Sequence, residues 1–476
     1  MRIRYKKSVL FILALLFIGL STVNLNAQDI TNWYGELNVS STTLPITLKI
    51  ERRADTTIIL MGSPAQTDRM FGVTKQRVTK DSIIFSIKNM GVVYRGKYNE
   101  TEDTIKGSFK QGVMLQDLSF GKTKDVYELK RPQEPKPPYP YFEQELGFKV
   151  KGVDYDFKGT LTLPSRGGVY PCVILVTGSG MENRDEEVLG HKPFKVIADY
   201  LTRNGISVFR YDDRGWAAKT LDPKITEATT LDFANDAQAA FDMLKTNPNI
   251  DSKKIGMLGH SEGGPIVSIC ASKNSDIKFI ILLAGTGMKG IDVLLQQNEA
   301  AFKKDKAPQY VIDVQLAALR ETYKLIKKDL SNEEIKKRMN KWFDAEGKKH
   351  SMEEWKNIQF SSDAARIHFI SFMTDNWTKT FLKLDPSDYL KKVKQPVFAL
   401  NGTEDIQVLY QYNLPAIENA MKKANNAHYT QYKAEGMNHL FQECKMCTVD
   451  EYQKIEQTIS PIILEKLRDF IKENTK

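Results

Sequence analysis

The chain has 476 residues, of which 41% are hydrophobic, enough to form more than one domain with a sizeable core. Its formal net charge is +9, from 68 Lys and Arg residues against 59 Asp and Glu residues, and it contains only four cysteines. So small an excess of positive charge gives no reason to expect a nucleic-acid partner. No paired Cys or His motif offers enough ligands for a zinc site.

The first 27 residues have the pattern of a secretory signal peptide. Basic residues at positions 2, 4, 6 and 7 precede the apolar stretch Val9–Leu20, and the short segment Leu25–Ala27 ends in a small residue. We expect cleavage after Ala27 and export to the periplasm or beyond. The apolar stretch is too short to span a membrane and no cysteine follows it, so we expect no stable membrane anchor. Loss of these four basic residues changes the formal charge to +5 (+9 minus 4).

Residues 28–130 alternate apolar and polar positions in short runs, as in Ser82–Ile87, with Gly, Asn and Asp between the runs. This pattern predicts a small antiparallel all-β domain, either a barrel or a sandwich. We expect it to pack or to face a partner rather than to bind carbohydrate. The Pro-rich segment 131–141 predicts an extended, semi-rigid linker.

Residues 142–476 alternate strand-like and helix-like segments, which predicts an α/β domain with a mainly parallel sheet covered by helices. The alternation stops at 288–385, where apolar residues recur at helical spacing, as in Val311–Lys328. We interpret this insertion as a helical cap that walls the substrate pocket and excludes water. The cap and the β domain are the candidate contact surfaces for a homo-oligomer, whose formation the sequence leaves open.

The expected oxyanion site lies early in this domain. The apolar strand Pro171–Val176 runs into Thr177–Gly180, whose glycines allow close approach of a ligand to the backbone. In an acyl-transfer enzyme this loop supplies one N–H to the negative oxygen of the tetrahedral intermediate. We expect that donor to be Ser179, with Gly180 as the second choice. The other donor would be the N–H of Glu262.

The segment Gly259–Gly263 has the sequence Gly-x-Ser-x-Gly and follows the apolar run Lys254–Leu258. Placed between a buried strand and a helix of small residues, it predicts a nucleophile elbow with Ser261 at its tip. The glycines let strand and helix pack closely around a strained turn. We expect His260, which flanks the nucleophile, to have a packing role.

A serine nucleophile needs a base, and the base needs a carboxylate that orients it. The apolar strand Gln395–Leu400 runs into a loop that holds Glu404 and Asp405, and His439 follows in a later loop. The order Ser, acid, His is that of the α/β-hydrolases. We predict Asp405 as the acid, with Glu404 as the near alternative, and His439 as the base.

From about Glu143 onward the chain resembles the α/β-hydrolase fold, and more narrowly the bacterial carboxylesterase-like and serine aminopeptidase-like (S33-type) hydrolases. Beside the elbow, the blocks that carry the resemblance are Gly178–Gly180 with Arg184–Glu186, Arg210–Gly215, Leu400–Val408, Asn438–Gln442 and Thr458–Pro461. One departure is the segment Trp216–Thr220, where the family usually has a small Ser/Thr-containing turn. The resemblance implies a hydrolase, and we expect it to need no cofactor and no metal.

Three functions are compatible with these residues. The first is an exported serine esterase that cleaves small or medium acyl esters through Ser261, His439 and Asp405. The second is a serine peptidase, with Glu333–Glu334 or Glu353–Glu354 of the cap recognising a substrate amine. The third is a non-catalytic binding protein on a hydrolase scaffold, which would be expected to have a broken triad.

The remaining chemistry-bearing residues have structural interpretations. Cys172 and Cys270 fall on expected buried elements and are typical of core thiols, whereas the pair Cys444 and Cys447 can close a local disulfide in an exported protein. Two further expectations are ion pairing of Asp213 and Arg214 with Arg184 and Asp185, and a choice between pocket lining and core packing for Trp377 and Phe381.

Overall fold

The computed structural model describes residues 29–476 except 40–41, 53–55, 64–69, 89–90, 100, 102, 112–113, 123–129, 217–224 and 226. The expected signal peptide, residues 1–27, and most of the departing segment after Trp216 lie outside the described residues. The chain divides into two compact units. Within the described residues, the first holds 29–132 with 187–191, and the second holds 133–186 with 192–476.

The first unit is built on a nine-stranded antiparallel sheet in the order β4-β3-β2-β1-β9-β8-β7-β6-β5. Alternation along the strands places one set of side chains in a core, as in β6, where Ile83, Phe85 and Ile87 are buried. The strands are β1 (Asp29–Val39), β2 (Thr42–Arg52), β3 (Thr57–Gly62), β4 (Phe71–Gly72), β5 (Lys75–Val78), β6 (Ser82–Ile87), β7 (Val92–Asn99), β8 (Thr104–Gln111) and β9 (Met114–Gly121). The predicted antiparallel β domain is confirmed.

The second unit contains an eight-stranded sheet in the order β10-β11-β13-β12-β14-β15-β16-β17. The β10, β11 and β13 neighbours are antiparallel, and every later pair, from β13–β12 to β16–β17, is parallel. The strands are β10 (Phe142–Lys149), β11 (Asp156–Leu163), β12 (Tyr170–Val176), β13 (Ser207–Tyr211), β14 (Ile250–His260), β15 (Ile280–Leu283), β16 (Val397–Gly402) and β17 (Tyr429–Ala434). The mainly parallel sheet is as predicted.

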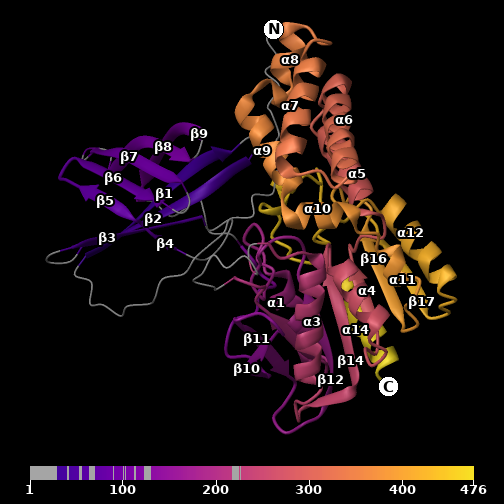
Figure 1. Ribbon diagram of the computed structural model, residues 1–476. Helices are drawn as coiled ribbons and strands as arrows, with labels where there is room; N and C mark the ends of the chain where they lie inside the picture. The colour runs from indigo at the N-terminus through magenta and orange to yellow at the C-terminus, as the bar shows by residue number, and fades with distance from the viewer. Residues whose placement is uncertain are drawn as a thin grey trace. The chain divides into compact units, whose positions relative to one another are not determined.

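Helices cover both faces of this sheet because its buried strands are apolar on both sides. On β12, Val173 and Leu175 pack with α1 (Pro193–Arg203) and α14 (Pro461–Asn474), whereas Cys172, Ile174 and Val176 share a core with the helices of the other face. Those helices are α3 (Thr230–Leu244), α4 (Gly263–Lys273) and α12 (Tyr410–Lys423). Figure 1 shows α3 and α4 lying along the sheet.

The cap inserts between β15 and β16 and has its own apolar core, which includes Ile335, Met339, Phe343 and Phe360. Figure 1 shows α5 to α9 gathered at one end of this unit, with α10 between them and the helices α3 and α4. Its elements are α5 (Gly290–Lys304), α6 (Gln309–Ile326), α7 (Asn332–Gly347), α8 (Met352–Asn357), the short 3-10 helix η2 (Gln359–Ser361), α9 (Asp363–Thr374), α10 (Asn376–Lys383) and α11 (Ser387–Leu390). A four-residue helix, α13 (Val449–Tyr452), precedes α14. Among the described residues, no helix is both long and apolar enough to cross a bilayer.

Candidate active site

Ser261 stands on a strained turn between β14, which ends at His260, and α4, which begins at Gly263. Its φ is +51°, a left-handed conformation that a residue with a side chain rarely adopts. Gly259 and Gly263 must be glycines because there is no room for a Cβ at either position. A Cβ on Gly259 would lie 2.0 Å from the Gly263 carbonyl oxygen, and one on Gly263 would lie 2.3 Å from that of Val176. The Gly-x-Ser-x-Gly pattern therefore encodes a turn that presents one hydroxyl at the carboxyl end of a central strand.

His439 and Asp405 are joined by a hydrogen bond of 2.8 Å from the imidazole Nδ1 to the carboxylate Oδ2. Both side chains are buried, at 6% and 0% exposure. Nδ1 donates its hydrogen to the carboxylate. The other ring nitrogen, Nε2, is therefore the one left to take a proton. Glu404, the alternative acid, instead points to Lys304 at 3.9 Å and is 47% exposed.

Asp405 is held by four donors. Its Oδ1 accepts the N–H groups of Gln407 at 2.7 Å and Val408 at 2.9 Å, and its Oδ2 accepts the Asn401 amide at 3.1 Å in addition to His439. These bonds satisfy a buried carboxylate and fix its direction toward the imidazole. Asp405 follows β16 and His439 follows β17, so both come from the carboxyl edge of the sheet.

The loop after β12 approaches the nucleophile closely. A Cβ built on Gly178 would lie 3.3 Å from the Cβ of Ser261. The N–H of Gly178 is already used, since it donates to the Glu186 carboxylate at 2.9 Å. Among the hydrogen bonds of the described residues, none takes the backbone N–H of Ser179, Gly180 or Glu262 as donor. The N–H groups of both predicted oxyanion donors, Ser179 and Glu262, are thus unused by hydrogen bonds within the described residues.

The side chain of Glu262 faces inward and links the elbow to the cap. It is 1% exposed, and its Oε1 accepts the Thr230 hydroxyl at 2.5 Å and the indole N–H of Trp377 at 2.9 Å. Burial raises the pKa of this carboxyl, and the hydrogen bonds from Thr230, Trp377 and Ser179 oppose part of that rise. Through the Trp377 indole, α10 of the cap contacts the residue after the nucleophile. Trp377 also stacks on Phe381 of the same helix, with ring centroids 5.4 Å apart.

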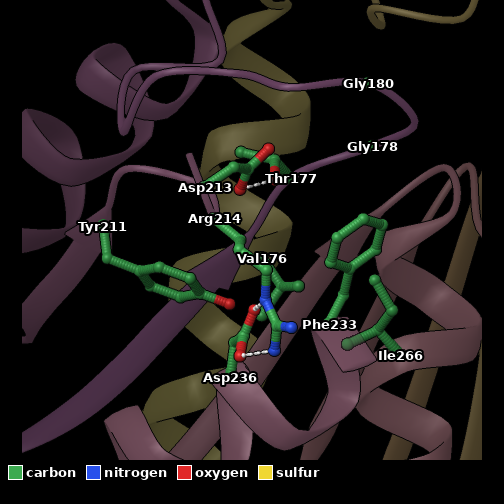
Figure 2. Close-up of a pocket in the computed structure, with 10 residues that line it drawn as sticks. All are labelled: Val176, Thr177, Gly178, Gly180, Tyr211, Asp213, Arg214, Phe233, Asp236 and Ile266. Atoms are coloured by element: carbon green, nitrogen blue, oxygen red, sulfur yellow. Dashed lines mark hydrogen bonds and ion pairs between the residues drawn. The ribbon is translucent and has the colours of Figure 1, made fainter. Parts of the chain in front are cut away.

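A small pocket lies beneath the Gly178–Gly180 loop (Figure 2). Figure 2 shows the Arg214 guanidinium turned toward Asp236, while Asp213 faces Thr177. Burial, with the charges of Glu186 and Asp236, raises the pKa of Asp213 well above its ordinary range, although the Thr177 hydroxyl and the Glu182 N–H oppose this. The lining residues are Val176, Thr177, Gly178, Gly180, Tyr211, Asp213, Arg214, Phe233, Asp236 and Ile266.

The expected ion pairing of Asp213 and Arg214 with Arg184 and Asp185 is wrong. Arg214 pairs with Asp236 of α3 at 2.5 Å, in a site where both side chains are at most 4% exposed. Asp213 instead accepts the hydroxyl of Thr177 at 2.7 Å and the N–H of Glu182 at 2.9 Å. Arg184 pairs with Asp212 and Glu145. Asp185 pairs with Arg210. The sequence could not supply these pairings, because they depend on which strands become neighbours.

His260 and Glu186 are functional candidates that the sequence reasoning missed. The His260 Nδ1 lies 2.8 Å from Glu186 Oε1, and its Nε2 lies 3.1 Å from the backbone oxygen of His439. Both ring nitrogens of this buried histidine are thus hydrogen-bonded. The available signal was its position beside Ser261, together with an acidic residue in the loop after the oxyanion glycines.

Cys444 and Cys447 form a disulfide in the segment after His439. Glu451 lies beside them and accepts the N–H groups of Lys445, Met446 and Cys447 at 3.1, 2.8 and 2.6 Å. In the described part of the chain, these two cysteines and Glu451 form the one His/Cys/Asp/Glu group with metal-like spacing. Because the sulfurs are bonded to each other and the carboxylate is occupied, this group does not fit a metal ion.

Known proteins resemble parts of this chain. The serine aminopeptidase S33 family of hydrolases matches residues 192–338. Esterase EstD of Thermotoga maritima is 33% identical over 154 residues, which is 32% of this chain, and the match spans about a third (34%) of that relative's length.

Solved structures also match at low identity. Est1E from Butyrivibrio proteoclasticus is 16% identical, with a TM-score of 0.40 over 69% of this chain and 98% of that one. A dienelactone hydrolase from Anabaena variabilis is 13% identical, with a TM-score of 0.40 over 71% of this chain and 100% of that one. The strand order with its elbow, the family match and the esterase relative show that the second unit has the α/β-hydrolase fold, and they confirm the resemblance to esterase-like members of that superfamily.

Proposed function

We propose that the chain is an exported serine hydrolase that cleaves carboxylic esters of small or medium acyl groups. The observation that carries the proposal is the buried bond between His439 and Asp405, formed beside an elbow that holds Ser261 at a φ of +51°. The His439 ring lies 4.7 Å from the ring of His260, the residue that precedes the nucleophile. A base oriented by a carboxylate and located next to a strained serine is the arrangement that acyl transfer requires.

In the proposed reaction, His439 Nε2 takes the proton of the Ser261 hydroxyl as its oxygen attacks the ester carbonyl. Asp405 keeps the imidazole in the correct tautomer and stabilises the imidazolium that forms. The protonated histidine then gives its proton to the departing alcohol, which leaves an acyl group on Ser261. A water molecule, deprotonated by the same imidazole, attacks that acyl group and releases the acid.

The N–H groups of Ser179 and Glu262 would hold the negative oxygen of each tetrahedral intermediate. Their support is that neither is used by another hydrogen bond in the described chain, and that the Gly178–Gly180 loop approaches Ser261 closely. One such donor stabilises the transition state by about 3–4 kcal/mol. Binding the transition state more tightly than the ester is what raises the rate.

The direct test is Ser261→Ala, assayed with p-nitrophenyl esters of increasing acyl length. We expect turnover to fall to background, because the remaining groups offer no nucleophile, while the circular dichroism spectrum and the unfolding midpoint stay unchanged. Ser275→Ala is the matched control, since Ser275 is exposed in the loop after α4. Undiminished hydrolysis by Ser261→Ala would reject the proposal.

A serine peptidase is the second candidate, favoured by the match of residues 192–338 to the serine aminopeptidase family. Two of the four cap glutamates considered for amine recognition have partners within the cap, since Glu334 pairs with Arg338 and Glu354 caps α8 through Ser351. Comparing p-nitrophenyl esters with aminoacyl anilides on the same preparation separates the two activities. Faster turnover of an anilide than of every ester would favour the peptidase.

Export and assembly belong to the same proposal. We infer from residues 1–27 that the protein is exported and loses this segment, and mass spectrometry of protein secreted by its host would locate the new N-terminus after Ala27. The expected partner is a small-molecule ester and not a nucleic acid. Light scattering of that mature protein would show whether it forms a homo-oligomer.

A further inference from the structure

His260 is bonded on both sides of its ring in a buried site. Nδ1 lies 2.8 Å from the Glu186 carboxylate and Nε2 lies 3.1 Å from the backbone oxygen of His439. The two side chains are 7% and 3% exposed. A carbonyl oxygen can only accept, so Nε2 carries a hydrogen, and a carboxylate can only accept, so Nδ1 carries one too. The geometry therefore describes an imidazolium paired with a carboxylate.

The pair connects three parts of the candidate active site. The Glu186 oxygen that faces His260 also accepts the N–H of Gly178, at the start of the oxyanion loop. His260 itself precedes Ser261 on the elbow. Its Nε2 reaches the backbone of His439, the expected base. One charged pair thus connects the oxyanion loop and the base by hydrogen bonds to the elbow that carries the nucleophile.

The charges around the ring favour its protonated form. Glu186 faces it from the loop between β12 and α1, Asp405 acts on it from the loop after β16, and the His439 ring lies 4.7 Å away. Burial lowers the pKa of His260, but the charge and hydrogen bond of Glu186, the His439 carbonyl and the charge of Asp405 outweigh burial and leave that pKa above its ordinary value.

We propose that His260, held protonated by Glu186, is a positioning residue that keeps Ser261, His439 and the oxyanion loop in reactive register. This inference rests on the proposed serine hydrolase function and extends it. Loss of the Nδ1 proton would leave a lone pair of the ring facing a buried carboxylate. The repulsion would separate the Gly178 loop from the elbow, and misplacement of reacting groups by about 1 Å can cost about 100-fold in rate.

The first test is the pH dependence of kcat in Glu186→Gln. The glutamine side-chain oxygen can accept hydrogen bonds from the Gly178 N–H and from protonated His260. If His260 loses its Nδ1 proton, Nδ1 becomes an acceptor and needs a donor. An oxygen that accepts from Gly178 cannot also donate to Nδ1. At the acid end of the active range we expect kcat near the wild-type value. The alkaline fall in kcat should begin about 1–3 pH units lower, because an opposite charge has been removed. KM should change little, since both side chains of the pair are buried.

Two further variants divide the roles of the ring nitrogens. His260→Gln can keep the bond to the His439 carbonyl and lose that to Glu186, whereas His260→Asn can keep the Glu186 bond and lose the other. Both should lower kcat by about 100-fold and remove the alkaline fall that His260 causes. His428→Gln is the control, because His428 is exposed and precedes β17; its kcat and its pH profile should match those of the wild type.

A second measurement does not depend on turnover. Nitrogen-15 NMR of histidine-labelled protein, with His260 assigned through the His260→Gln variant, should show both ring nitrogens protonated at pH 7. A neutral ring at that pH would overturn the inference, as would a Glu186→Gln profile lowered by one factor at every pH. If Ser261→Ala kept full activity, the proposed hydrolase mechanism would fail while the protonation of His260 could still be measured, so the two failures are distinguishable.

Discussion

Ser261, His439 and Asp405 show how few atoms must be placed for the proposed chemistry. The elbow strains Ser261, and Asp405, with four donors of its own, fixes which nitrogen of His439 faces the reaction. The carboxylate thus holds the imidazole in one orientation through a buried hydrogen bond. Such preorganisation is the main source of rate in acyl-transfer sites.

A substitution of the acid tests this at the residue scale. Asp405→Asn should lower kcat on a p-nitrophenyl ester by about 10⁴-fold, because an amide can hold His439 in the wrong tautomer while leaving its position unchanged. Glu404→Gln should behave like the wild type, since Glu404 is 47% exposed and faces Lys304. Equal losses in the two variants would contradict the assignment of Asp405.

At the scale of elements, helices and strands are fastened to one another by buried charges as well as by apolar packing. Arg214 follows β13 and Asp236 lies on α3, so their ion pair joins these two elements. Both residues line the small pocket. Burial raises the pKa of Asp236 to about 6, although its bond to Arg214 opposes the rise. At neutral pH the pair is therefore ionised and desolvated.

Asp236→Asn should destabilise the second unit, because it leaves the Arg214 guanidinium buried without a counter-ion. Breaking a buried pair in this way typically costs about 3–5 kcal/mol. Urea unfolding at pH 7.5 measures the loss. Asp276→Asn is the matched control, because it removes the acid of an exposed pair with Lys245 and should leave the unfolding midpoint almost unchanged. A similar loss in both variants would mean that burial does not set the cost.

Elements were predictable where a local pattern determines them. Alternation in 28–130 predicted the antiparallel sheet, strand–helix alternation predicted the parallel sheet, and helical spacing predicted the cap helices that the structure shows. The elbow was recognisable because its glycines are needed locally. Glu186 and His260, by contrast, are 74 residues apart, and only the folded sheet brings them together. The same reason explains the unexpected partner of Arg214.

At the scale of the whole molecule, the His260–Glu186 pair should make stability depend on pH. The pKa of His260 is higher in the folded chain than its ordinary value of about 6.5. The folded state therefore binds more protons above that pH, so this contribution is fully present below pH 6.5 or so and is lost as pH rises through the folded pKa.

We expect the difference in unfolding free energy between the wild type and Glu186→Gln to be largest at mildly acidic pH and to shrink as pH rises. Urea unfolding of both proteins at a series of pH values measures this difference, and other titrating groups cancel in it to a first approximation. A difference that stays constant over the whole series would mean that His260 does not change its proton in that range.

The measurement that tests the central claim most directly is mass spectrometry of the protein after treatment with a fluorophosphonate. The account predicts one adduct per chain, located on the peptide that contains Ser261, formed in step with loss of ester hydrolysis and absent from Ser261→Ala. An adduct on a different residue, or full hydrolysis by protein completely labelled at Ser261, would contradict it.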